Sequence, residues 1–259
     1  MNACVAVLIP AVFILAEEYH NSNLQDSEKS KDIGGSSDYP GNCADSINVP
    51  EDFRFLLWNY HNSHRALLQL GEVRNGNEGE GKKFPSSSDM NLLAYDCDLE
   101  RSAWNISKQC QNTREYDFSN VGTNSETFYL SSTASALNEH DINSEQNTEF
   151  YETMYEEIIP KWWNTSENSP PLADNLKPTD DNKPMIPFLQ MANAKTTKVG
   201  CAYSICDSSN SASKFVSFVC IYGDELISKD KPLYTKGTPC DTCPNNCDVS
   251  WKLCKRTSN

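Results

Sequence analysis

Residues 184–206 read PMIPFLQMANAKTTKVGCAYSIC, a stretch that is apolar at its start and strand-forming in its second half. Its second half, residues 195–206, and the later segment 214–223 (KFVSFVCIYG) alternate and contain many β-branched and aromatic residues, as strands do. Helical patterns come before it. Helices first and strands afterward, without βαβ repetition, predict an α+β fold rather than a parallel sheet.

Three helices are expected ahead of the strands. The clearest spans residues 50–71, where apolar side chains recur at helical spacing, acidic residues stand at the start and Gly71 suits the end. A second helix is expected from about 90 to 110, and a third over 148–163. Pro160 should kink or end the third helix, because proline lacks the backbone N–H that a helix interior requires.

The composition describes an acidic, fairly polar chain. It has 259 residues, of which 38% are hydrophobic, and a formal net charge of −14. Such a surface repels phosphate, so nucleic acid and an anionic membrane face are poor partners. The uncharged run 3–16 is too short to cross a bilayer and predicts a signal peptide over residues 1–16, followed by a polar leader over 17–49.

Cysteine usage agrees with export. The chain has 11 cysteines, and removal of a signal peptide containing Cys4 leaves an even set. An even set in an exported chain predicts five disulfides, although the pairing stays open. The CxxC near the C-terminus also suits zinc or a redox dithiol, but export favours plain crosslinks within a cysteine-rich extension over residues 224–259. The ten are Cys43, Cys97, Cys110, Cys201, Cys206, Cys220, Cys240, Cys243, Cys247 and Cys254.

Few residues suggest catalysis. The chain has four histidines, and no His-Glu-x-x-His helix, Gly-x-Ser-x-Gly elbow or phosphate-binding glycine loop. His61 and His64 lie three apart on the first expected helix and offer half of a metal site, but one packed and one surface histidine is the favoured interpretation. Asn105 and Asn164 begin the sequons Asn-Ile-Ser and Asn-Thr-Ser, which accept glycans in exported proteins.

Several stretches, taken in order, resemble the CAP superfamily of cysteine-rich secretory proteins, venom antigen-5-like allergens and plant pathogenesis-related-1 proteins. The nematode venom-allergen-like branch, with its Ancylostoma-secreted-protein members, is the most similar. The resemblance covers residues 50–223, and the extension resembles the short hinge of many members. The matching residues are His61-Asn62-x-x-Arg65, Met90-x-Leu92-x-x-Tyr95-Asp96-Cys97-x-Leu99-Glu100, Trp162-Trp163, Phe188-x-Gln190-Met191-Ala192, Lys198-Val199-Gly200-Cys201 and Val219-Cys220-x-Tyr222.

The resemblance implies a three-layer α-β-α sandwich with an antiparallel central sheet and a cavity where two His and two Glu hold a divalent metal. Carried over by position, Glu126 matches the first Glu, whereas Thr165 stands at the second and Pro187 at the last His position. No histidine follows Cys110 where the first His is expected. We therefore expect a degenerate cavity with no metal, no cofactor and no catalytic residue, because too few ligands and no titratable base remain.

Family members also bind lipids, and the resemblance implies that role here. For a sterol beside the cavity, the candidates are Tyr116, Phe118, Phe128 and Tyr129. For a fatty acid between two helices, they are Phe53, Leu57, Trp58, Tyr151 and Tyr155, with core packing as the simpler explanation. The expected function is that of a secreted, non-enzymatic parasite effector that binds lipids and modulates host immunity. The alternatives are a metal-dependent hydrolase, or a protein that blocks a host receptor or channel through its cysteine-rich end.

Overall fold

A computed structural model of the chain describes residues 43, 49–77, 82–111, 115–130, 153–208 and 213–255. All of them belong to one compact unit, Asp38–Asn259. The expected signal peptide and nearly all of the polar leader fall outside the described residues. Where the structure is described, no helix has both the length and the apolar character needed to cross a membrane.

The first expected helix is confirmed as α2, Glu51–Gln69. Pro50 precedes it in an extended conformation, and Glu51 and Asp52 lie in its first turn, where the positive end of the helix dipole stabilises acids. Gly71 follows the helix with a φ of 75°, the left-handed conformation in which glycine commonly ends helices.

The second helix, α3, spans Cys97–Ser107 and begins about seven residues later than expected. The side chain of Asp96 caps it by accepting hydrogen bonds from the N–H groups of residues 98 and 99. Upstream, the chain is extended because the side-chain amide of Asn62 bonds both the N–H (2.8 Å) and the carbonyl (3.1 Å) of Leu93. A partner on α2 therefore overrides the helical spacing of residues 90–96.

Pro160 was expected to kink or end the third helix; the helical run is irregular just before this proline and continues past it. A π-helical turn, η2 (Met154–Ile158), leads into α6 (Ile159–Trp163) and then a 3-10 turn, η3 (Asn164–Ser166). Pro160 stands in the first turn of α6, where the missing N–H is tolerated. The wider π turn before it accommodates the irregular hydrogen bonding.

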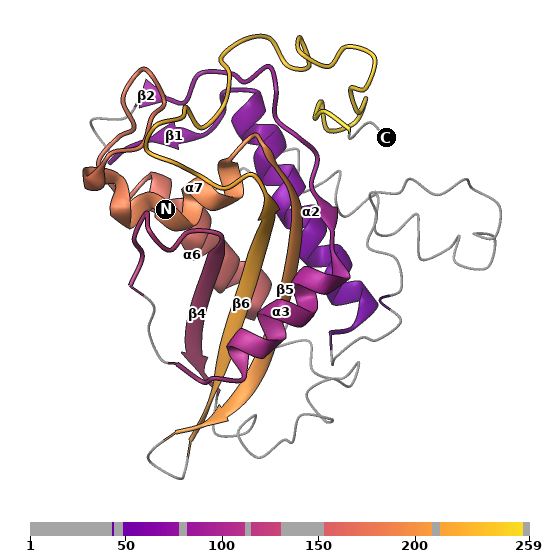
Figure 1. Ribbon diagram of the computed structural model, residues 1–259, viewed down its shortest axis with the longest axis vertical. Coiled ribbons are helices and arrows are strands. Elements are labelled where there is room, and N and C mark those ends of the chain that lie inside the picture. Colours follow the sequence, from indigo (N-terminus) through magenta and orange to yellow (C-terminus); the bar gives the residue numbers. More distant parts are fainter. Residues whose placement is uncertain are drawn as a thin grey trace, which may run out of the picture. The chain divides into compact units, whose positions relative to one another are not determined.

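The expected strands form the centre of a four-stranded sheet (Figure 1). β5 (Thr196–Asp207) and β6 (Lys214–Asp224) pair antiparallel, and β4 (Thr123–Tyr129) pairs antiparallel with β6. β3 (Ala94–Tyr95) completes the order β3-β5-β6-β4 and is the short parallel member. A separate pair, β1 (Arg74–Asn75) and β2 (Lys82–Lys83), is antiparallel.

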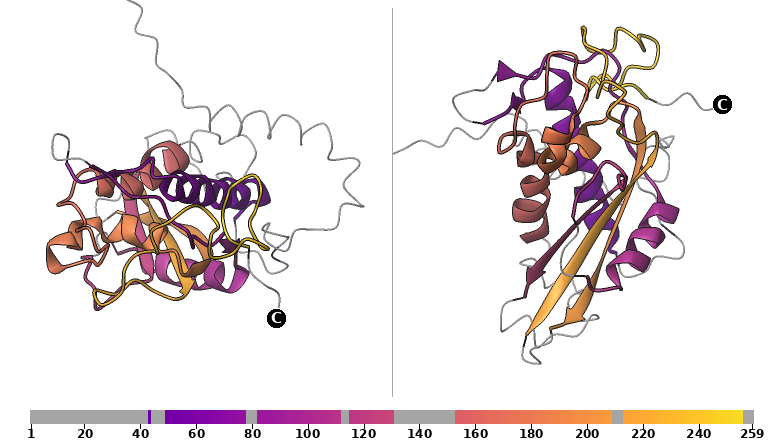
Figure 2. Two further views of the ribbon diagram at one scale, coloured as in Figure 1. Left: turned by 90° about the horizontal axis from the view of Figure 1, so that it is seen from above. Right: turned by 60° about the vertical axis from the view of Figure 1, so that its left-hand side comes forward.

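Helices cover both faces of this sheet and give the expected three layers (Figure 1, Figure 2). α3 lies so close to β5 that a Cβ on Gly200 would overlap its backbone at Glu100. On the opposite face, the Phe53 ring of α2 contacts Phe218 with 6.4 Å between centroids, and Trp162 of α6 stacks on Phe218 at 5.3 Å. The short helices η4 (Asp180–Met185) and α7 (Ile186–Ala192) follow α6.

All ten expected cysteines form disulfides, and the structure supplies the pairing that the sequence left open. The pairs are Cys43–Cys97, Cys110–Cys206, Cys201–Cys220, Cys240–Cys247 and Cys243–Cys254. The cysteine-rich tail packs against the rest of the unit, because Leu233, Tyr234 and Leu253 join the common hydrophobic core.

Candidate functional site

The three positions that the resemblance assigns to the cavity come from neighbouring elements. Glu126 lies on β4, Thr165 in η3 and Pro187 in α7. The N–H of Phe188 donates to Thr165 Oγ1 at 3.2 Å, which joins η3 to α7. Asn124 Nδ2 donates to the Pro187 carbonyl at 3.0 Å, which joins β4 to α7. The three elements that carry the positions assigned by the resemblance are therefore neighbours in the fold.

Glu126 is held by a cation from the same chain. Its Oε2 lies 2.7 Å from Lys161 Nζ, and the carboxylate side chain is 22% exposed. Its Oε1 also accepts a hydrogen bond from the N–H of Thr127 at 3.3 Å. Both carboxylate oxygens of Glu126 thus have a partner within the chain. Nothing in the sequence indicated that Lys161 would be one of them.

Thr165 and Pro187 contribute no strong metal ligand. The Thr165 hydroxyl donates to the Trp162 carbonyl at 2.7 Å and accepts from the Phe188 N–H of α7. It therefore already serves as both donor and acceptor within the fold. Proline carries no side-chain lone pair or proton, and its carbonyl is taken by Asn124. What remains at these positions is a neutral hydroxyl and an apolar ring.

The first-helix histidines are structural. The Nδ1 atoms of His61 and His64 lie 2.7 Å and 2.9 Å from the carbonyls of Leu57 and Tyr60, so each Nδ1 carries the proton. Burial lowers the pKa of both imidazoles to about 4, which keeps them neutral at physiological pH. His64 is half-buried and stacks on Tyr60, so the expected surface histidine is in fact packed.

His61 begins a buried polar network that ends behind the candidate site. Its Nε2 accepts from the Tyr222 hydroxyl at 3.1 Å, and that hydroxyl accepts from Asn124 Nδ2 at 3.1 Å. Asn124 Oδ1 accepts from Gln190, which also donates to the Thr123 carbonyl at 3.1 Å. Each described member has partners, which buried polar groups need. His61, Gln190 and Tyr222 all belong to the motifs that carry the family resemblance, but the sequence did not indicate that they form one network.

The loop aromatics proposed for a sterol lie beside and along β4. The Tyr116 hydroxyl donates to the Ser125 carbonyl at 3.0 Å and accepts from its N–H at 3.1 Å. Phe118 is half-buried, 6.0 Å from Lys229 Nζ. Further along, Phe128 is half-buried and Tyr129 is 66% exposed. Apolar ring surface is therefore available mainly at the end of β4.

The helix residues proposed for a fatty acid are mostly packed. Phe53 is 2% exposed and Leu57 is fully buried, and both belong to the core. Trp58 donates to the Leu93 carbonyl at 2.7 Å and meets Trp251 of the tail edge-on. Tyr155 is half-buried against Tyr60, and Tyr151 lies outside the described residues. Among the described members of this set, Tyr155 keeps the most surface.

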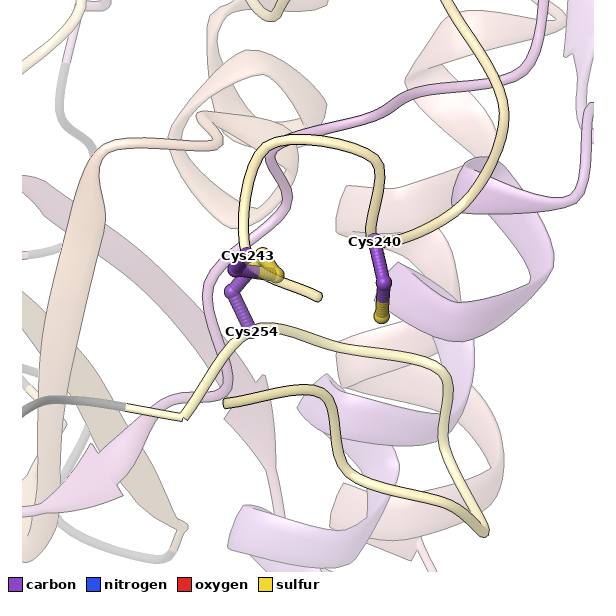
Figure 3. Close-up of side chains that lie close together, drawn as sticks. All are labelled: Cys240, Cys243 and Cys254. Carbon is purple, nitrogen blue, oxygen red and sulfur yellow. A yellow bond between two sulfur atoms is a disulfide. The ribbon is translucent and has the colours of Figure 1, made fainter. Parts of the chain in front are cut away.

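One group of sulfurs has the spacing of a metal site, in the tail. Cys240, Cys243 and Cys254 bring three Sγ atoms within 4.8 Å of one another (Figure 3). All three are oxidised: Cys240 forms a disulfide with Cys247, and Cys243 forms one with Cys254. A metal needs thiolates, so the disulfide bonds leave these sulfurs unsuitable as ligands.

Two hollows lie near the tail, away from these positions. A cavity of about 140 Å³ is lined by residues that include Asp89, Lys195 and Tyr234. A more open one of about 400 Å³ shares Asp89 and Lys195 and reaches the Cys243–Cys254 disulfide. The ion pair between Asp89 and Lys195, at 2.9 Å, stands on the border of both. Neither hollow is lined by a candidate cavity residue.

Comparison with known proteins identifies the family. The model of the cysteine-rich secretory protein (CAP) family matches residues 58–222, more than half of the chain. The chain belongs to the CAP family. The CAP chain is 27% identical over 218 residues to venom allergen 5 of Tityus serrulatus, a match that covers 81% of the chain and 47% of the scorpion protein. It thus spans about half the length of that relative.

Two further likenesses cover most of both proteins. Hookworm platelet inhibitor 1 of Ancylostoma caninum is 23% identical, over 81% of this CAP protein and 85% of the inhibitor. The crystal structure of NaASP2 with Zn²⁺ is similar with a TM-score of 0.58 and 26% identity, covering 83% of this chain and 98% of NaASP2. These likenesses agree with the mixed α and β fold described above.

The zinc in NaASP2 raises the question of whether this CAP protein fits a metal at the cavity positions. Zinc binds three or four thiolate, imidazole or carboxylate ligands. Here Glu126 is the one such side chain among the three positions, and its carboxylate contacts Lys161. The nearby His61 uses both ring nitrogens within the fold. These residues do not fit a zinc ion.

Proposed function

We propose that this CAP protein acts by binding rather than by catalysis. The observation that carries the proposal is the Glu126–Lys161 ion pair at 2.7 Å, with Thr165 and Pro187 standing where the resemblance implies Glu and His. Acid–base catalysis needs a group that titrates near neutral pH and can reach a substrate. The buried, neutral His61 offers neither property. Because the described residues at these positions offer neither a set of metal ligands nor a base, they support a role in recognition.

Secretion is part of the proposal. Five disulfides within one compact unit are typical of proteins that fold in oxidising compartments. The apolar run over residues 3–16 suits an export signal. The acidic composition favours a freely diffusing extracellular protein over one that adheres to anionic membranes.

The proposed ligand is a lipid, with a sterol as the first candidate. Sterols need apolar and aromatic walls with a few polar anchors, and they need no metal. Phe128 and Tyr129 lie at the end of β4 on opposite faces of the sheet, so each offers a wall on its own face, and Tyr129 keeps 66% of its surface accessible. Phe118 lies in the loop that precedes the strand. A fatty acid between α2 and the π-helical turn is less well supported, because Phe53 and Leu57 are core residues.

A binding assay with labelled cholesterol tests the lipid proposal. We expect saturable binding by the wild type and a severalfold loss in a Phe118→Ala, Phe128→Ala double variant. The matched control is Val249→Ala, which also removes exposed apolar surface, because Val249 is 79% exposed in the tail. Absence of sterol and fatty acid binding at micromolar protein concentrations would reject the lipid as ligand. Equal losses in the control variant would reject the proposed location.

The proposed setting is modulation of a host by a parasite protein. The supporting likeness is to hookworm platelet inhibitor 1, whose name states an action on platelets. A competing mode is direct blockade of a host receptor or channel by the disulfide-bonded tail, in which Val249 is an exposed apolar residue suited to a test. Surface plasmon resonance with host immune-cell receptors distinguishes the two: Val249→Asp abolishes binding only if the tail makes the contact.

A further inference from the structure

The two glycosylation sequons differ in the surroundings of their third residue, the serine. Both acceptor asparagines, Asn105 on α3 and Asn164 in η3, are exposed. Both hydroxyl residues, Ser107 and Ser166, are fully buried. A buried hydroxyl is retained either because it makes hydrogen bonds or because something other than folding requires it. The surroundings of the two serines separate these reasons.

Ser107 has a clear role in folding. Its Oγ lies 2.7 Å from the Oγ of Ser204 on β5, and it donates to the Trp104 carbonyl at 2.9 Å. The bond to Ser204 joins α3 to the sheet near the Cys110–Cys206 disulfide, and the bond to Trp104 lies within the helix. The sequon at Asn105 is therefore explained by the packing of Ser107, and its presence says little about glycosylation.

Ser166 has no such role. Its side chain is fully buried, and its Oγ has no hydrogen-bond partner among the described residues. An unpaired buried hydroxyl lowers stability relative to a methyl group of similar size. Folding alone would favour alanine at this position. The hydroxyl is explained if it is needed before folding, when the extended chain meets the glycosylation machinery.

We propose that Asn164 carries an N-linked glycan and that Ser166 is retained as the hydroxyl residue of its sequon. In the transfer step, the Asn164 side-chain nitrogen bonds to the anomeric carbon of a lipid-diphosphate-linked oligosaccharide. The bond from that carbon to the diphosphate oxygen breaks, the lipid diphosphate leaves with the electron pair, and the amide gives up one proton. The inference rests on the secretion proposed above, because this chemistry belongs to the secretory pathway.

The proposed glycan stands beside the candidate residues Glu126 and Thr165. Asn164 follows Lys161 by three residues, so the two lie on the same side of the helical run. Lys161 reaches Glu126 at 2.7 Å, and Thr165 is the residue next to the acceptor. A glycan on Asn164 therefore shields the Glu126–Lys161 pair, and partners meet sugar at this part of the surface.

The first test is glycan occupancy after secretion of the full chain from eukaryotic cells. Mass spectrometry after enzymatic release of glycans in ¹⁸O water should mark Asn164 in the wild type. Ser166→Ala and Asn164→Gln should each lose one glycan, whereas Asn105→Gln should retain the Asn164 glycan. A secreted chain with Asn164 unmodified overturns this inference and leaves secretion standing. A chain that stays in the cytosol overturns both.

The second test is the shielding, measured by acetylation of lysines with an amine-reactive reagent. Lys231 is a matched internal control, because it is 64% exposed and ion-paired with Glu225 at 2.7 Å, while Lys161 is 63% exposed and paired at the same distance. In the Ser166→Ala variant, Lys161 should be acetylated severalfold faster than in the glycosylated wild type, whereas the acetylation rate of Lys231 should not change. Equal Lys161 rates in the glycosylated wild type and in Ser166→Ala overturn the shielding, and thermal unfolding verifies that the variant is folded.

Discussion

Asn124 and Glu126 stand two residues apart on the same face of β4, yet their surroundings are opposite. Asn124 is fully buried in a network that runs from His61 through Tyr222 to Gln190, where every described polar atom has a protein partner. Glu126 is partly exposed and is neutralised by a flexible lysine. Buried polar groups of this CAP protein are concentrated in the network that stabilises the fold, and few polar groups lie at the positions that the resemblance assigns to a metal cavity.

The largest effect should come from acidifying the network. The pKa of His61 is about 4 in the fold, against an ordinary value of 6.5, because burial disfavours the charged ring. Below pH 6.5 the unfolded chain takes up a proton that the folded chain refuses until about pH 4, so stability falls as pH drops through this window. For His61 alone the loss is about 3 kcal/mol across the window.

Urea unfolding at several pH values between 7.5 and 4.5 measures this loss. The control is His61→Gln, which removes the titrating ring, so its stability should depend less steeply on pH than that of the wild type. Identical pH dependence in the two proteins would contradict the assigned burial. His64, with its pKa also lowered to about 4, adds a second contribution in both proteins.

Removing one hydroxyl from the network should have the next largest effect. Tyr222→Phe leaves the Nε2 of His61 and one N–H of Asn124 without this partner in the interior. The expected cost is about 2 kcal/mol, because buried groups left unpaired lose their hydrogen bonds without regaining water. The control is Tyr155→Phe, whose half-buried ring packs on Tyr60. A loss in Tyr222→Phe no larger than in this control contradicts the network as a source of stability.

Breaking the ion pair at the candidate site should have the smallest effect. Lys161 is 63% exposed and Glu126 22%, so solvent and salt screen the pair. Glu126→Gln and Lys161→Met should each change the free energy of unfolding by less than about 1 kcal/mol. A double-mutant cycle in low and high salt measures the coupling. A coupling as large as the Tyr222→Phe loss would erase the contrast between the two regions.

Local patterns predicted the elements that depend on local sequence. The helix over residues 51–69 and the strands β5 and β6 follow from periodicity and end signals alone. The start of α3 was missed because Asn62, some thirty residues earlier, holds residue 93 extended. The π turn before Pro160 has no signal in hydrophobic spacing.

The candidate site was predictable only in part. The resemblance identified Glu126, Thr165 and Pro187, and the fold brings their elements together. It said nothing of Lys161, whose role requires β4 and α6 to be neighbours in space. Nor did the sequence separate packed from partly exposed rings, since Phe53 and Tyr155 were both candidates for a fatty acid site but differ in burial. Contacts between distant segments decide these points.

Isothermal titration of the purified, disulfide-intact protein with Zn²⁺ tests the central claim most directly. With the Glu126 carboxylate already occupied by Lys161 and both ring nitrogens of His61 bonded within the fold, we expect no saturable binding in the micromolar range and no difference between the wild type and Glu126→Gln. One-to-one tight binding that is lost in Glu126→Gln would show that the cavity still seats a metal, and the account of a binding protein without catalytic chemistry would be contradicted.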